Sequence, residues 1–161
     1  MRINKNFLIL LAAMLFVSSL SSAQAGKVPP FRILKPDGKV FKAQDLPMGK
    51  PIILIYFLPD CDHCQKLTKV LTKRITEFKK ASIAMITYQP LNQVSRFVND
   101  YNLKKYPNFY VGTEGSSLFV RNYYNIMQMP FVALYTKNGD LIKLYPKDEG
   151  LNDLSLRLKK L

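Results

Sequence analysis

Two patterns of apolar residues divide the chain into short strands and amphipathic helices. Residues 52–58 and 82–88 are nearly continuous apolar runs, which is the pattern of strands buried on both faces of a sheet. Between these runs, apolar residues recur every three or four positions, as on one face of a helix that ends near residue 80. These residues are Leu67, Val70, Leu71, Ile75 and Phe78. A strand, a helix and a second strand form a right-handed unit, so the two strands are predicted to be parallel.

Further elements are predicted on both sides of this unit. Residues 31–34 and 39–41 alternate like strands around a Pro-Asp-Gly turn, so we expect an N-terminal hairpin. After the second buried strand, the pattern predicts a helix at 91–102, a strand at 108–111, a short helix within 112–124, strands at 129–135 and 141–145, and a closing helix at 152–161. This order predicts a single α/β domain with a central mixed β-sheet flanked by helices.

The first 25 residues differ from the rest and have the pattern of an export signal. Two basic residues precede an apolar stretch of eleven residues, 7–17, and an A-x-A cleavage pattern follows at 23–25. The apolar stretch is too short to span a bilayer as a mature anchor, although an uncleaved anchor stays an alternative. We therefore expect 1–25 to be a cleaved signal peptide and 26–161 to be one domain, exported to the periplasm or the exterior of a bacterium.

The chain is strongly basic, with 24 Lys and Arg against 11 Asp and Glu and a formal net charge of +13. Removing Arg2 and Lys5 with the signal leaves 22 basic and 11 acidic residues, a net charge of +11. The basic residues are scattered or form short pairs such as Lys104-Lys105, so no nucleic-acid partner is predicted. A positive surface of this kind suits acidic partners or an anionic membrane surface.

The candidate chemistry lies where the first buried strand meets its helix. Cys61 and Cys64 are the only cysteines, and they open the helix after a turn. Positions three apart share a helix face, so the pair can close a disulfide with little backbone movement. The unpaired N–H groups and the helix dipole favour the thiolate of Cys61. This context predicts dithiol–disulfide exchange, with Cys61 as the nucleophile and Cys64 as the more buried, resolving thiol.

Other interpretations of the cysteine pair are weaker. A zinc site needs four ligands, and the sole histidine, His63, lies between the two cysteines, so neither a metal nor another cofactor is predicted. A purely structural disulfide would close a very short loop and would stabilise little. Asp62 and His63 are expected to modulate the pair, because a protonated His63 stabilises a Cys61 thiolate and Asp62 opposes it.

Several further motifs occur together with the cysteines between residues 28 and 145. They are the N-terminal hairpin, Gly49-Lys50-Pro51, the Cys61-Asp62-His63-Cys64 motif, Tyr123, Met129-Pro130-Phe131 and Asn138-Gly139-Asp140. In this combination the chain resembles the thioredoxin-like family, and within it the exported TlpA-like, redoxin-type thiol–disulfide oxidoreductases. The resemblance implies a thioredoxin-like fold with an N-terminal hairpin extension and a redox-active disulfide between Cys61 and Cys64. It also implies a cis peptide bond between Met129 and Pro130 that faces the cysteines and lines a substrate groove.

The sequence departs from this family at three positions near the cysteines. Many members carry a carboxylate six residues before the first cysteine, where this chain has Ile55. A glutamate and a bending proline are common after the second cysteine, where this chain has Leu67 and Lys69. No buried acid is therefore predicted as a proton acceptor for Cys64, which leaves the direction of exchange open.

The resemblance implies an exported oxidoreductase that exchanges disulfides with protein substrates. Its partners would be cysteine-containing exported proteins and a redox partner, such as a membrane protein, that resets the dithiol. Two alternatives stay open, namely a copper(I)-binding protein, since two thiolates suit that ion, and a peroxidase-type protein. A copper-delivering relative would be expected to have wider cysteine spacing and a distant histidine, so the sequence favours the oxidoreductase.

Overall fold

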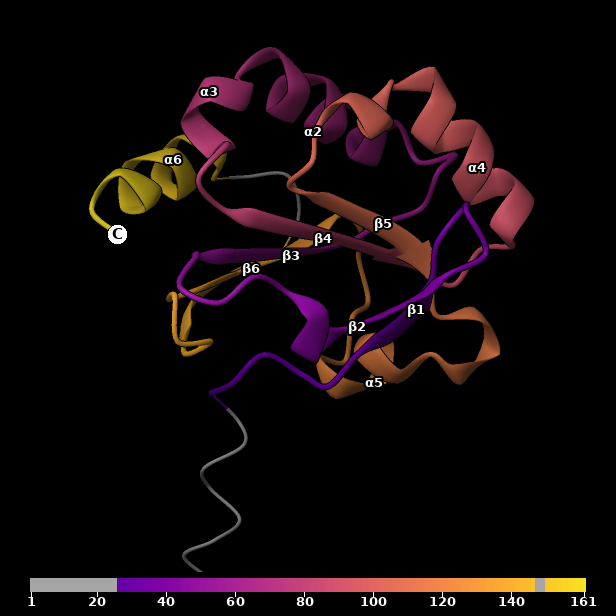
Figure 1. Ribbon diagram of the computed structural model, residues 1–161, viewed down its shortest axis with the longest axis horizontal. Coiled ribbons are helices and arrows are strands. Elements are labelled where there is room, and N and C mark those ends of the chain that lie inside the picture. The colour runs from indigo at the N-terminus through magenta and orange to yellow at the C-terminus, as the bar shows by residue number, and fades with distance from the viewer. Residues whose placement is uncertain (1–25, 147–149) are drawn as a thin grey trace, which may run out of the picture.

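A seven-stranded mixed sheet runs through the molecule, with helices on both of its faces (Figure 1). The computed structural model describes residues 26–146 and 150–161, so the predicted export signal lies outside the described residues. The strand order is β2-β1-β5-β4-β3-β6-β7. None of the described helices combines the length and the apolar character needed to cross a membrane.

The predicted strands are present with ends displaced by a few residues, and the predicted helices are present in whole or in part. The strands are β1 (Arg32–Leu34), β2 (Val40–Lys42), β3 (Ile52–Tyr56), β4 (Ser82–Thr87), β5 (Phe109–Thr113), β6 (Phe131–Tyr135) and β7 (Leu141–Pro146). The helices are α2 (Asp62–Lys73), α3 (Ile75–Phe78), α4 (Leu91–Asp100), α5 (Phe119–Tyr123) and α6 (Leu151–Lys159). Short 3₁₀ turns are η2 (Ala43–Asp45), η3 (Leu103–Lys105) and η4 (Gly115–Ser117).

Three parallel strands, β3, β4 and β5, form the centre of the sheet. β3 pairs with β4 and β4 pairs with β5, both in parallel, which confirms the predicted βαβ unit. β6 pairs antiparallel with the other side of β3, and β7 continues the sheet antiparallel to β6. Every residue of β3 and β4 is buried, as their continuous apolar sequences indicate.

The predicted N-terminal hairpin belongs to the same sheet. β1 pairs antiparallel with β2, and Leu34 of β1 pairs with Thr113 of β5. Gly112 of β5 lies against this hairpin, because a Cβ atom there would be 2.7 Å from the Leu34 carbonyl oxygen and 3.0 Å from the Ile33 Cβ. The absence of a side chain at Gly112 therefore permits the close approach of β1 to β5.

Alternate residues of the central strand point into two separate cores. Ile53, Ile55 and Phe57 face a core that α2, α3, α4 and α6 cover. Leu54 and Tyr56 face a second core on the other side, which includes residues of β1, β2 and α5. Figure 1 shows the same division, with α2, α3 and α4 above the sheet and α5 below it.

Two predicted helices are interrupted. The helix expected to reach about residue 80 breaks at Arg74, where α2 ends and α3 begins. The Arg74 guanidinium donates to both Glu77 carboxylate oxygens at 2.8 and 2.7 Å and to Asn152 of α6 at 2.8 Å. The apolar period continues through this break, so periodicity alone did not predict it. The segment expected to be one helix within 112–124 contains the end of β5, then η4 and α5.

We predict that Gly112→Ala destabilises the domain by about 1–3 kcal/mol, because the added methyl group must push β1 away from β5. Urea unfolding followed by circular dichroism measures the change. Gly26→Ala is the matched control, because no atom lies within 4 Å of a Cβ at Gly26. Equal midpoints for the two variants would contradict this account of Gly112.

Candidate functional site

Cys61 and Cys64 lie where β3 ends and α2 begins. Cys61 is the N-cap of α2, with an extended backbone, and its Sγ accepts a hydrogen bond of 3.4 Å from the Cys64 N–H. Both residues are thiols in this structure. An N-cap side chain accepts a hydrogen bond from the first turn of its helix, and the Cys61 sulfur has this role at the start of α2.

The two thiols differ sharply in exposure. Cys61 is partly exposed, whereas Cys64 is 0% exposed and belongs to the core between the sheet and α2. Burial raises the pKa of the Cys64 thiol, and its hydrogen bond with Cys61 acts in the same direction. This asymmetry is the one that the predicted roles of a nucleophile and a resolving thiol require.

The loop before β6 lies against Cys61. β6 pairs with β3 so that Phe131 is opposite Tyr56, which brings the residues before Phe131 to the sheet edge from which the cysteine loop emerges. The Met129–Pro130 peptide bond is cis, as the resemblance implied. The Cys61 Sγ is 3.9 Å from the Met129 carbonyl oxygen, which accepts its hydrogen bond. The structure therefore brings the predicted cysteine pair, Cys61 and Cys64, next to the two residues predicted to line the substrate groove, Met129 and Pro130.

The remaining predicted residues lie where the sequence indicated. Asp62 and His63 are exposed on the first turn of α2. Ile55 and Leu67, at positions where the resemblance implied carboxylates, are 0% and 2% exposed and lie in the apolar core. Among the described residues, no hydrogen bond joins Cys64 to a carboxylate, and no three His, Cys, Asp or Glu side chains are grouped as metal ligands.

A polar bridge beneath the site was not predicted from the sequence. The Tyr56 hydroxyl donates to Glu114 Oε1 at 2.6 Å, and the Val120 N–H donates to Glu114 Oε2 at 2.8 Å. Burial, together with this carboxylate, raises the pKa of Tyr56. Glu114 thus joins the strand that precedes the cysteines to α5, and α5 leads into the loop that carries Met129.

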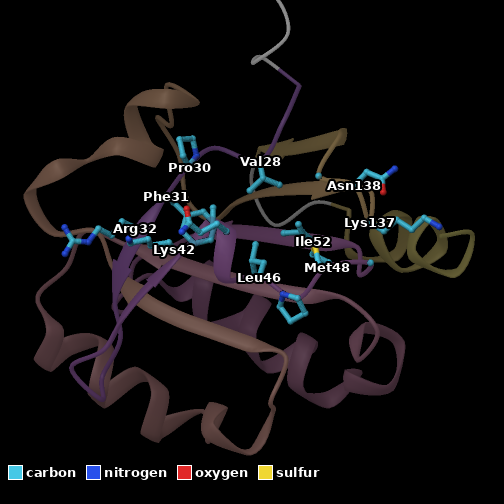
Figure 2. A pocket seen from close by; sticks show the side chains of 15 residues that line it. Val28, Pro30, Phe31, Arg32, Lys42, Leu46, Met48, Ile52, Lys137 and Asn138 are labelled. Carbon is cyan, nitrogen blue, oxygen red and sulfur yellow. The ribbon is translucent and has the colours of Figure 1, made fainter.

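Two grooves flank opposite ends of β3. One, of about 570 Å³, lies beside the cysteine loop and is lined by residues of that loop, α2 and α4. The other, of about 790 Å³, lies near Ile52 at the start of β3, between the N-terminal hairpin and the turn at Lys137 and Asn138 (Figure 2). The second groove lies at the end of β3 that is farther from Cys61, so it is not part of the candidate site.

Solved structures share this fold. A secreted disulfide oxidoreductase of Mycobacterium tuberculosis, homologous to Escherichia coli DsbE, is 21% identical, with a TM-score of 0.67 over 82% of this chain and 96% of that chain. A thiol–disulfide oxidoreductase of Bacteroides fragilis is 16% identical, with a TM-score of 0.67 over 83% and 98% of the two chains. A thioredoxin-like protein of Aeropyrum pernix is 13% identical, with a TM-score of 0.68 over 94% and 99%.

The chain therefore has the thioredoxin-like fold that its motifs implied. No protein-family model matches the sequence, and a search of curated proteins finds no match. The structural likeness establishes the fold, and the chemistry of the cysteine pair must be argued from its own geometry.

We predict that iodoacetamide modifies the folded, reduced protein at Cys61 alone, because Cys64 has no exposed surface. Mass spectrometry of the intact chain should show one added group, and unfolding in guanidinium before labelling should give two. Cys61→Ser serves as the control and should stay unlabelled while folded. Rapid labelling of Cys64 in that variant would contradict the burial asymmetry.

Proposed function

We propose that the protein is an exported thiol–disulfide oxidoreductase that exchanges disulfides with protein substrates through Cys61 and Cys64. The observation that carries the proposal is the asymmetric pair at the start of α2, in which a partly exposed Cys61 lies in front of a buried Cys64. Similar solved structures that are described as disulfide oxidoreductases support it.

The exchange proceeds in two steps, which together transfer two electrons from the dithiol pair to the substrate disulfide. The Cys61 thiolate attacks one sulfur of a substrate disulfide, the substrate S–S bond breaks, and the leaving thiolate takes up a proton. A mixed disulfide now joins Cys61 to the substrate. The Cys64 thiolate then attacks the Cys61 sulfur and releases the second substrate thiol, so the substrate gains two electrons and the pair becomes a disulfide. The same steps in reverse oxidise a substrate dithiol.

The second step depends on deprotonation of Cys64. Its raised pKa keeps this thiol protonated near neutral pH, and the apolar Ile55 and Leu67 provide no acid to accept the proton. Asp62 and His63 are proposed to tune the first step from the exposed turn beside Cys61, with opposite electrostatic signs.

Export and partners follow from the same proposal. The signal pattern at 1–25 supports export to the periplasm or the exterior of a bacterium, and one of the similar structures is a secreted protein. Substrates would be exported proteins with cysteines. Exported thiols meet an oxidising compartment. If Cys61 and Cys64 act as a reductant, a dithiol partner, such as a membrane protein, would therefore be needed to reduce their disulfide again.

The test of this proposal is reduction of insulin disulfides by the dithiol form. We expect the wild type to reduce insulin and Cys64→Ser to stop at a covalent insulin adduct, because Cys64 is needed for release. Cys61→Ser, the matched control, should neither reduce insulin nor form an adduct. An equal yield of adduct from Cys61→Ser would contradict the assignment of the nucleophile. Tight binding of one copper(I) without insulin reduction would favour the copper alternative.

The raised pKa of Cys64 predicts a pH-dependent second step. A mixed disulfide of Cys61 with thionitrobenzoate should release that thiol about tenfold faster for each pH unit between about 6 and 8, because the thiolate fraction of Cys64 rises with pH below its pKa. Stopped-flow absorbance measures the release. Cys64→Ser is the control and should release nothing. A rate that does not change with pH would show that deprotonation of Cys64 does not limit this step.

A further inference from the structure

One groove lies directly beside the loop that leads to Cys61. It has a volume of about 570 Å³, and α2 and α4, which form its two sides, lie on the same face of the sheet (Figure 1). Pro59 and Asp60 line it and come directly before Cys61. Cys61 does not line the groove, so a segment bonded to Cys61 would reach it across Pro59 and Asp60.

The carboxylates of the groove lack partners in a strongly basic protein. Asp60 and Asp100 line it, and neither forms an ion pair or a hydrogen bond with a described residue. By contrast, six other described carboxylates are each bonded within the chain, namely Asp37, Asp45, Glu77, Glu114, Asp140 and Asp153. Among the described residues that line the groove, Arg96 is the one cation, so two carboxylates and one guanidinium give this lining a net negative charge.

The other polar side chains of the groove suit a peptide backbone. Gln65, Asn92 and Gln93 line it with carboxamides, which can both donate and accept. Gln65 Nε2 donates to the Pro59 carbonyl at 3.0 Å, and Asn92 Oδ1 accepts from the Gln93 N–H at 2.9 Å. These two bonds leave the Gln65 side-chain oxygen, the Asn92 side-chain nitrogen and the Gln93 side-chain carboxamide available to hydrogen-bond a bound peptide.

We propose that this groove binds an extended, polar segment next to the substrate cysteine and prefers a basic residue in that segment. The inference rests on the proposed function, because it needs a substrate bonded to Cys61. It predicts that, within the proposed substrate class, disulfides flanked by lysine or arginine react faster than those flanked by acidic residues. Asp60 and Asp100 would attract the basic side chain, while the carboxamides would bond the peptide groups around it.

The test uses two disulfide-linked peptides that are identical except for Lys or Glu beside the cysteine. The wild type should reduce the Lys peptide with a kcat/KM about two- to fivefold higher, the size of one exposed charge pair. Asp100→Asn should bring this ratio close to one, and Arg96→Gln should raise it. Added salt should weaken the preference, since the charges are exposed.

Asp140→Asn is the matched control, because Asp140 is a half-exposed carboxylate in the turn between β6 and β7 and does not line the groove. It removes the same charge far from Cys61 and should leave the ratio of the two rates unchanged. A wild-type ratio of one or below, or an equal loss of preference in Asp140→Asn and Asp100→Asn, would overturn the inference. Reduction of neither peptide would overturn the proposed function itself, and this inference with it.

Discussion

The pairing of β6 with β3 is the constraint on which the site depends. Tyr56, the last residue of β3, lies opposite Phe131, the first residue of β6. Because the strands are antiparallel, the chain that leaves β3 toward Cys61 and the chain that enters β6 after Pro130 meet at one edge of the sheet. A shift of this register would move the Met129 carbonyl away from the Cys61 sulfur and would turn every side chain of β6 to the opposite core.

The packing of α2 against the sheet also buries Cys64. Leu67 and Leu71 bury the apolar face of α2 against β3, and Cys64 lies on that face one turn earlier. In the proposed exchange, burial would protect the resolving thiol from outside oxidants and disulfides, but it also disfavours the thiolate that the second step would need. A buried acid beside Cys64 would relieve this conflict by accepting its proton. Ile55 and Leu67, which stand where the resemblance implied carboxylates, are apolar and lie in the core instead.

Local patterns predicted most of the fold and the cysteine pair, because both depend on residues close together in sequence. Strands β3 and β4 follow from continuous apolar runs, and Cys61 and Cys64 follow from spacing at a helix start. The bridge from Tyr56 to Glu114 joins residues 58 positions apart, and no periodicity encodes it. The contact between Arg74 and Asn152 spans 78 positions, so the sequence pattern did not predict the break before α3 either.

The charges of the whole molecule and of the groove act at different distances. A net charge of +13 in the full chain attracts acidic surfaces from afar, but salt screens such attraction beyond about 8–10 Å. In the proposed groove, Asp60 and Asp100 would act only on groups that already lie beside Cys61. The overall positive charge would therefore act on acidic surfaces only at close approach, while the proposed groove would discriminate among the segments that reach the thiol. A substrate with a basic segment beside its cysteine and an acidic surface elsewhere would satisfy both fields at once.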